Sequence, residues 1–101
     1  MARLVRFAPR YLRQAHRLGL RSGTPIARDV GRVISALENE QDLPGPGDVY
    51  SFVPDPTRRE EAVQLLAHAR RVVGRNLWIW YWATDEEVQL VALTNIPPTR
   101  A

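Results

Sequence analysis

The chain has 101 residues, a length typical of a single domain, and its shares of hydrophobic (45%) and charged (25%) residues are those of an ordinary globular protein. It has no cysteine, which excludes a disulfide framework and a thiolate metal site, and no apolar run approaches the roughly 20 residues that a membrane-spanning helix needs. All 14 basic side chains are arginines, and the net charge of +3 is uneven, because residues 1–32 carry +7 and residues 33–56 carry −5.

The first predicted elements lie in this basic third of the chain. Residues 2–7 (ARLVRF) are rich in β-formers and predict a strand. The N-terminus has no long apolar core, so we do not interpret it as a signal peptide, and we expect a cytoplasmic protein. Pro9 then opens a helix that ends at Gly19. One side of this helix is apolar, and the other carries candidate contacts to RNA or an acidic partner, namely Arg10, Arg13 and Arg17.

A second helix is predicted over residues 25–39. Thr24 is a good N-cap, and Pro25 suits the first helical position. Apolar residues then follow at helical spacing from Ile26 to Leu37. Because only a short Gly/Ser/Thr turn precedes it, this helix should form an antiparallel helical hairpin with the first one.

The middle of the chain predicts a loop, a strand and a third helix. Residues 43–48 (LPGPGD) must form a loop, and residues 49–53 (VYSFV) alternate as a short strand does. Thr57 and Glu60 fit a capping box, and the apolar spacing after them predicts a helix to about residue 67. Residues 68–74 fit either the end of that helix or the start of a strand.

The last part of the chain predicts a β-hairpin. Residues 75–83 (RNLWIWYWA) and 88–95 (VQLVALTN) flank the acidic turn TDEE. A turn centred on residues 85 and 86 fixes the cross-strand pairs, which include Tyr81–Leu90, Ile79–Ala92 and Trp80–Val91. In this register Leu77, Ile79 and Tyr81 face the helices, and the tryptophans occupy the other, more open face.

The predicted order is β-α-α-β-(α)-β-β. We therefore expect one α+β domain over residues 1–101, with a small, mainly antiparallel sheet and the N-terminal helical hairpin packed on one of its faces.

Trp78, Trp80 and Trp82 alternate along one predicted strand, and three interpretations of them stay open. They can pack in the core, form a surface for a partner protein, or stack on bases. The side chains grouped with them as candidate contacts to RNA or a partner are Arg70, Arg71, Arg75 and Asn95. Neither the two histidines nor the acidic turn has the spacing of a catalytic or metal site, and we expect no metal and no cofactor.

This layout resembles the RelE/ParE toxin superfamily, the small growth-inhibiting toxins of bacterial type II toxin–antitoxin modules. The stretch VGRNLWIWYWATDEEVQLVAL at 73–93 is similar to the end of the family's fold, where a basic residue and a glycine precede an aromatic strand, an acidic turn and an aliphatic last strand. The opening LVRFAPRYLRQAHRL resembles the family's first strand and helix.

The resemblance implies a toxin that is neutralised by a cognate antitoxin in a hetero-oligomeric complex. RelE-like members are ribosome-dependent mRNA endonucleases that use basic and polar side chains of the sheet instead of a metal. In such an enzyme Arg71, Arg75 and Arg100 would orient the RNA and balance the charge of the scissile phosphate. ParE-like members bind DNA gyrase and are not nucleases, and a non-toxic interaction module of the same fold is a third interpretation.

Two departures from the RelE-like pattern bear on this choice. Trp78 stands where the nucleases usually carry an arginine, and the C-terminal TNIPPTRA contains Arg100 but neither histidine nor tyrosine. Because arginine stays protonated, these residues offer poor candidates for a general base.

Overall fold

The computed structural model describes residues 2–54 and 65–98. Within them the chain forms β1 (Leu4–Phe7), α1 (Pro9–Arg17), α2 (Pro25–Asn39), β2 (Val49–Phe52), β3 (Leu66–Arg71), β4 (Trp78–Ala83) and β5 (Glu87–Thr94). The strands build a five-stranded sheet in the order β1-β5-β4-β3-β2. β1 runs parallel to β5, and the other neighbours are antiparallel. The predicted α+β class and the mainly antiparallel sheet are confirmed.

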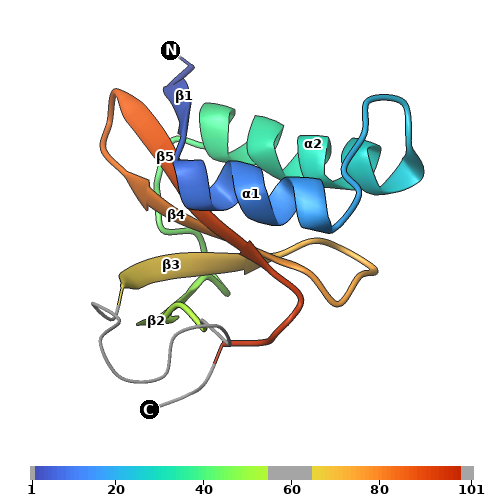
Figure 1. Ribbon diagram of the computed structural model, residues 1–101. Helices are drawn as coiled ribbons and strands as arrows, with labels where there is room; N and C mark the ends of the chain where they lie inside the picture. Colours follow the sequence, from blue (N-terminus) through green and yellow to red (C-terminus); the bar gives the residue numbers. More distant parts are fainter. Residues whose placement is uncertain (1, 55–64, 99–101) are drawn as a thin grey trace.

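Both helices cover the same face of the sheet, which we call the helix face (Figure 1). α2 begins where its signals predicted, because the Thr24 hydroxyl accepts a hydrogen bond from the Ala27 N–H at 3.2 Å and Pro25 follows as the first helical residue. Gly19, with φ of +72°, lets the chain leave α1 and turn back toward α2. The predicted helical hairpin is confirmed, and neither described helix is long and apolar enough to cross a membrane.

The main core lies between the helices and the helix face. Its buried members are Tyr11 of α1, Val30, Val33 and Leu37 of α2, and Val72, Leu77, Ile79, Tyr81, Val88, Leu90 and Leu93 of the sheet and the turn after β3. Burying a side chain of this size contributes roughly 1.5–3 kcal/mol relative to leaving it exposed. This layer is therefore the main source of stability that holds the sheet under the helical hairpin.

The β4–β5 ladder contains a β-bulge. Tyr81 pairs with Leu90 as the turn predicted, but the register changes between Trp80 and Tyr81. Beyond that point Trp80 lies opposite Ala92 and not opposite Val91, which is the extra residue of the bulge. The predicted register is therefore right next to the turn and wrong beyond the bulge.

The bulge changes which side chains of β5 face the helices. Strict alternation would turn Ala92 toward the helices and Leu93 away from them. With the bulge, Leu93 pairs with Ile79 and packs in the helix-face core, whereas Ala92 packs on the opposite face. The predicted orientation of Leu77, Ile79 and Tyr81 toward the helices is confirmed.

β3 corrects the predicted third helix. The apolar spacing predicted a helix to about residue 67, whereas the structure begins a strand at Leu66 and continues it to Arg71. Residues 57–64, with the predicted capping box, lie outside the described residues. β3 is paired with β2 on one side and β4 on the other, and this pairing overrides the helical spacing. The open question about residues 68–74 is answered by a strand followed by a turn.

The N-terminus is fixed by a buried arginine. Arg3 donates hydrogen bonds to the carbonyl oxygens of Thr84, at 2.6 Å, and of Gln41, at 3.1 Å. It also donates to the carbonyl oxygens of Leu37 and Glu40, at the C-terminal end of α2, where backbone carbonyls carry partial negative charge. One arginine of the basic N-terminal third is therefore structural.

Candidate functional site

The three tryptophans of β4 lie on the face opposite the helices, the Trp face, in three different environments. Trp80 has no exposed surface, and its Nε1 donates to the Thr94 hydroxyl at 2.9 Å. Trp78 is half-buried, with the Arg71 guanidinium 5.8 Å from its ring centroid. Trp82 is 41% exposed. The expectation of an open Trp face is wrong at Trp80, which belongs to the core, so Trp78 and Trp82 supply the tryptophan surface that a partner or a base could contact.

Arg70 is the centre of a salt-bridge cluster. Its Nε and Nη2 donate to the two carboxylate oxygens of Asp48, both at 2.8 Å. Its Nη1 and Nη2 donate to Glu40 at 2.5 and 3.0 Å. The Tyr81 hydroxyl and the Gly45 N–H also donate to Asp48. Arg70, a candidate RNA or partner contact in the sequence, is thus held between two carboxylates inside the fold.

The electrostatics of this cluster fix its protonation states at neutral pH. Burial alone would raise the pKa of Asp48, whose side chain is 2% exposed, but hydrogen bonds from Arg70 and Tyr81 outweigh burial and hold this pKa below its usual value of 3.8. Hydrogen bonding to Asp48 is the main reason that the pKa of Arg70 is raised. Burial, and then the bond to Asp48, raises the pKa of Tyr81. Asp48 and Arg70 are therefore held as a charged pair, with Tyr81 protonated beside them.

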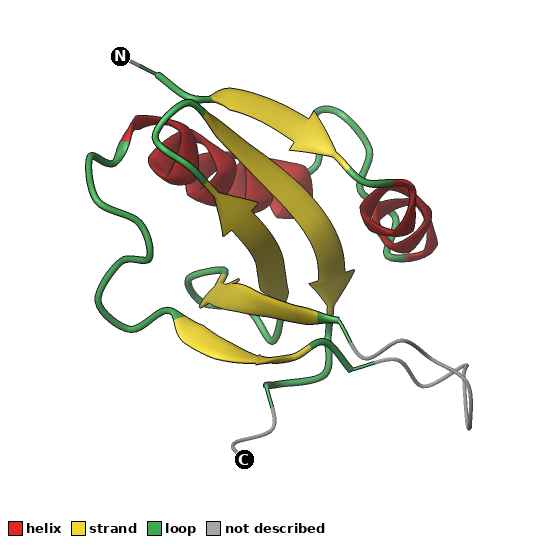
Figure 2. Cartoon of the chain, turned by 90° about the vertical axis from the view of Figure 1, so that its left-hand side faces the viewer, coloured by secondary structure: helices red, strands yellow, loops and turns green. Residues whose placement is uncertain are grey.

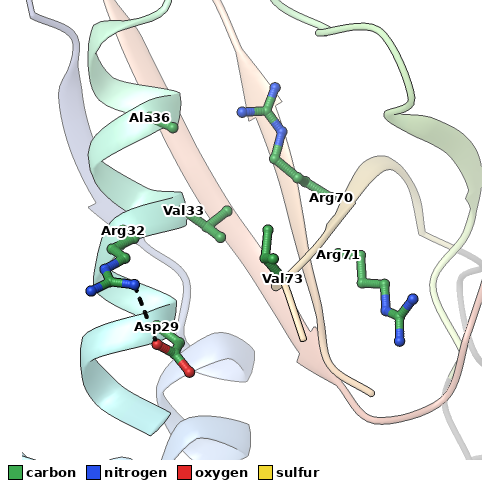
Figure 3. Close-up of a pocket in the computed structure, with 7 residues that line it drawn as sticks. All are labelled: Asp29, Arg32, Val33, Ala36, Arg70, Arg71 and Val73. Atoms are coloured by element: carbon green, nitrogen blue, oxygen red, sulfur yellow. Dashed lines mark ion pairs between the residues drawn. The ribbon is translucent and has the colours of Figure 1, made fainter. Parts of the chain in front are cut away.

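A pocket of about 420 Å³ lies between α2 and the end of β3 with the turn after it (Figure 3). It is lined by Asp29, Arg32, Val33, Ala36, Arg70, Arg71 and Val73. Val33 and Val73 lie between the helix and the strand, whereas the guanidinium groups of Arg32 and Arg71 point away from the middle. An apolar wall with arginines at its rim suits an apolar group that has an acidic neighbour.

Two of the three predicted catalytic arginines meet at the edge of this pocket. The Arg71 Nε donates to the backbone carbonyl of Arg75 at 2.9 Å, and the Arg75 Nε donates to Asp29 of α2 at 2.7 Å. Arg71 stays exposed, whereas Arg75 is half-buried in its ion pair. Arg100 lies outside the described residues. The structure brings Arg71 and Arg75 together, but it uses the charge of Arg75 to bind the turn to α2.

The other candidate contacts are spread over a different part of the surface. Arg13 and Arg17 are exposed, one turn apart on α1, and Arg10 is half-buried on the same helix. α1 packs on β5, whereas the pocket lies beside β3. Asn95 is exposed after β5, and its carbonyl accepts a hydrogen bond from the Asn76 side chain at 3.1 Å.

β2 and β3 extend beyond the helices (Figure 2), and these strands carry a ring stack that the sequence analysis did not single out. The His68 ring is flanked by Tyr50, with ring centroids 4.7 Å apart, and by Tyr81, at 5.9 Å. Tyr50 is 58% exposed and Tyr81 is buried, so the stack leads from the surface to the Asp48 carboxylate. Imidazole can exchange a proton near neutral pH, which gives this surface a candidate acid–base group.

His68 was not predicted as a functional residue, because the chain has only two histidines and they lie far apart in the sequence. The signal that places it in a cluster is strand pairing, since His68 lies opposite Tyr50 on one side and Tyr81 on the other. A pattern of neighbouring residues in the sequence gives no information about this register, because the paired residues are not neighbours in the chain. Among residues 2–54 and 65–98, no group of three or more His, Asp or Glu side chains is placed to hold a metal ion.

Comparisons with known proteins identified no relative of this chain. No protein-family model, curated protein or solved structure matches it. What the chain does must therefore be inferred from its own fold and side chains.

Proposed function

We propose that this chain is the toxin component of a type II toxin–antitoxin module of the RelE/ParE kind, and that it cleaves mRNA at the ribosome without a metal ion. Its layout supports the proposal, because an N-terminal strand, a helical hairpin and antiparallel strands that end in an aliphatic strand are what the resemblance implies. The observation that carries the nuclease part is His68 between Tyr50 and Tyr81, which supplies the general base that the arginines cannot provide.

In this reaction a neutral nitrogen of His68 takes the proton of a ribose 2′-hydroxyl group. The 2′-oxygen then attacks the adjacent phosphorus, and the bond between phosphorus and the 5′-oxygen breaks. The 5′-oxygen leaves with a proton, for which the phenolic O–H of Tyr50, whose ring lies beside that of His68, is the proposed donor. The exposed face of Tyr50 can also stack on a base.

The proposed cytoplasmic partner is an antitoxin whose chemistry matches the pocket beside α2. The apolar wall formed by Val33 and Val73 would take an apolar side chain, and the rim arginines Arg32 and Arg71 would pair with acidic neighbours of that side chain. An antitoxin segment bound there would lie close to Arg70, which is two residues from His68 on the same strand.

A ParE-like toxin that binds gyrase is the second candidate, and one observation favours it. Two of the arginines that were candidates to contact RNA are held by carboxylates, Arg70 by Glu40 and Asp48, and Arg75 by Asp29. A protein that only binds its target needs no cation beside a catalytic base, so this engagement of arginine side chains fits a binding toxin.

The two candidates are separated by induced expression in bacteria, followed by RNA mapping and a gyrase supercoiling assay. For the nuclease, the wild-type chain should arrest growth and cut ribosome-bound mRNA, and His68→Gln should lower the cutting rate by about 100-fold or more with the fold intact by circular dichroism. His16→Gln, on the exposed side of α1, is the matched control and should cut like the wild type. Intact mRNA together with reduced supercoiling would establish the gyrase candidate. Normal growth with neither effect would leave only an interaction module.

A further inference from the structure

β2 is an edge strand of the sheet, and its backbone is paired on one side only among the described residues. The Val53 N–H donates to the Leu65 carbonyl at 2.8 Å, which continues the ladder with β3. Hydrogen-bonded and non-hydrogen-bonded pairs alternate in an antiparallel ladder, so Ser51 directs its backbone groups to β3 as Val53 does. The backbone N–H and C=O groups of Tyr50 and Phe52 therefore point away from the sheet.

The side chains of this edge are aromatic and exposed. Tyr50 is 58% exposed and Phe52 is 44% exposed, and both lie on the helix face where β2 extends beyond the helices (Figure 2). Edge strands are commonly protected from pairing by a charged side chain or a proline, and residues 49–53 contain neither. Among residues 2–54 and 65–98, no strand pairs with this edge, so it is available to another strand.

The strand is also complementary to itself. Residues 49–53 read V-Y-S-F-V, which is the same sequence in both directions except that one aromatic residue replaces another. When two copies run antiparallel and are centred on Ser51, Val49 lies opposite Val53, and Tyr50 lies opposite Phe52. Opposite residues in such a pair share a face, which requires a twofold axis through Ser51, perpendicular to the sheet.

We propose that β2 pairs with β2 of a second copy of this chain in this register, so that one continuous sheet runs through a twofold-symmetric dimer. Tyr50 of each copy exchanges both backbone hydrogen bonds with Phe52 of the other, and their rings form a cross-strand pair on the helix face. Residues 49–53 carry no charge, so the paired segments themselves bring no like charges together although each chain has a net charge of +3.

The contact between the two β2 strands is small, and it lies beside the ring stack of β2, β3 and β4. A pair of strands this short buries less than the roughly 1,200–2,000 Å² typical of stable interfaces, so the dimer should form in a concentration-dependent way. Phe52 of the second copy would lie beside Tyr50 and extend the ring stack of Tyr50, His68 and Tyr81. The dimer does not depend on the proposed nuclease activity.

Sedimentation equilibrium of the purified full chain tests the proposal over a wide range of concentration. The wild type should show a monomer–dimer equilibrium, and Tyr50→Glu or Phe52→Lys alone should weaken it at least about tenfold. The double variant Y50E/F52K should regain the dimer, because the register places each new carboxylate opposite a new ammonium group. Leu4→Glu is the matched control, since Leu4 has the same 58% exposure on β1 at the other edge of the sheet, and it should leave the equilibrium unchanged.

A cross-linking experiment tests the centre of the register, because the chain has no cysteine of its own. Ser51 would lie opposite its own copy in a non-hydrogen-bonded pair, where Cα atoms are about 4.5 Å apart, within the range of disulfides. Ser51→Cys should form a disulfide-linked dimer much faster than Ser22→Cys, which is exposed in the turn between the helices. A chain that stays monomeric at every concentration overturns the proposal. So does equal cross-linking of the two variants, or a Leu4→Glu chain that dimerises as poorly as Tyr50→Glu.

Discussion

Arg70 shows how strand alternation decides the role of a single side chain. Its neighbour Arg71 lies over Trp78, whereas Arg70 points to the helix face and meets Glu40 and Asp48. Desolvation offsets much of the attraction in such a partly buried cluster, but the removal of one partner leaves the others unsatisfied. The cluster therefore fixes the loop after α2 against β3 and β4, and it orients Tyr81 beside the His68 ring.

Asp48→Asn should lower the free energy of unfolding by about 3 kcal/mol at pH 7, because Arg70 and Tyr81 lose their charged acceptor. The fold lowers the pKa of Asp48 below 3.8, so the unfolded chain takes up the proton first as the pH falls. The stability difference between wild type and variant should thus be full above about pH 5 and should shrink below about pH 4, as the folded pKa is approached.

Urea unfolding of both proteins in steps from pH 7 to pH 2 measures this difference. Asp85→Asn, in the exposed β4–β5 turn, is the control and should change stability by less than about 0.5 kcal/mol. A difference that stays constant down to pH 2 would show that the charge of Asp48 does not contribute.

Elements that depend on neighbouring residues could be predicted from the sequence, whereas features that depend on pairing between strands could not. The N-cap at Thr24 and the turn at residues 84–87 depend on neighbouring residues, and both α2 and the turn end of the β4–β5 ladder form where the sequence predicted. The strand that begins at Leu66 and the bulge at Val91 depend on partners across the sheet, so single-chain periodicity gave a helix for the first and missed the second.

Two glycines provide a test of how individual elements contribute to stability. Gly31 is exposed within α2, and a Cβ there would meet no atom within 4 Å, so Gly31→Ala should stabilise the fold by about 0.5–1 kcal/mol. Gly45 is buried, and a Cβ there would press on the Arg70 guanidinium and lie 3.2 Å from Glu40, so Gly45→Ala should destabilise it by about 1–3 kcal/mol. Thermal and urea unfolding of the two variants measure both effects, and equal shifts in one direction would contradict the packing around Gly45.

The whole molecule exposes fewer unpaired basic side chains in its N-terminal third than the charge pattern of the sequence suggests. Arg3 is buried under the end of α2, and Arg6 pairs with Glu87 at 2.8 Å, so two arginines of the N-terminal third bind the fold together. Arg71 and Arg75 were predicted from the sequence as members of one site, and they do lie together. His68 could not be predicted, because its neighbours come from two other strands. Arg13 and Arg17 are the exposed pair on α1 that a long-range electrostatic role would use.

If the chain binds RNA through α1, the double variant Arg13→Gln/Arg17→Gln should weaken the binding of a single-stranded RNA and make it less sensitive to salt. Each phosphate contact on a single strand contributes about 0.7 to the slope of log affinity against log salt, so the slope should fall by up to about 1.4. The double variant Arg21→Gln/Arg28→Gln removes the same charge from exposed positions outside α1 and should change the slope less. Fluorescence anisotropy of a labelled oligonucleotide between roughly 50 and 200 mM salt measures both. Equal losses would mean that net charge and not the α1 surface governs binding, and an unchanged slope in the first variant would exclude α1 from the RNA contact.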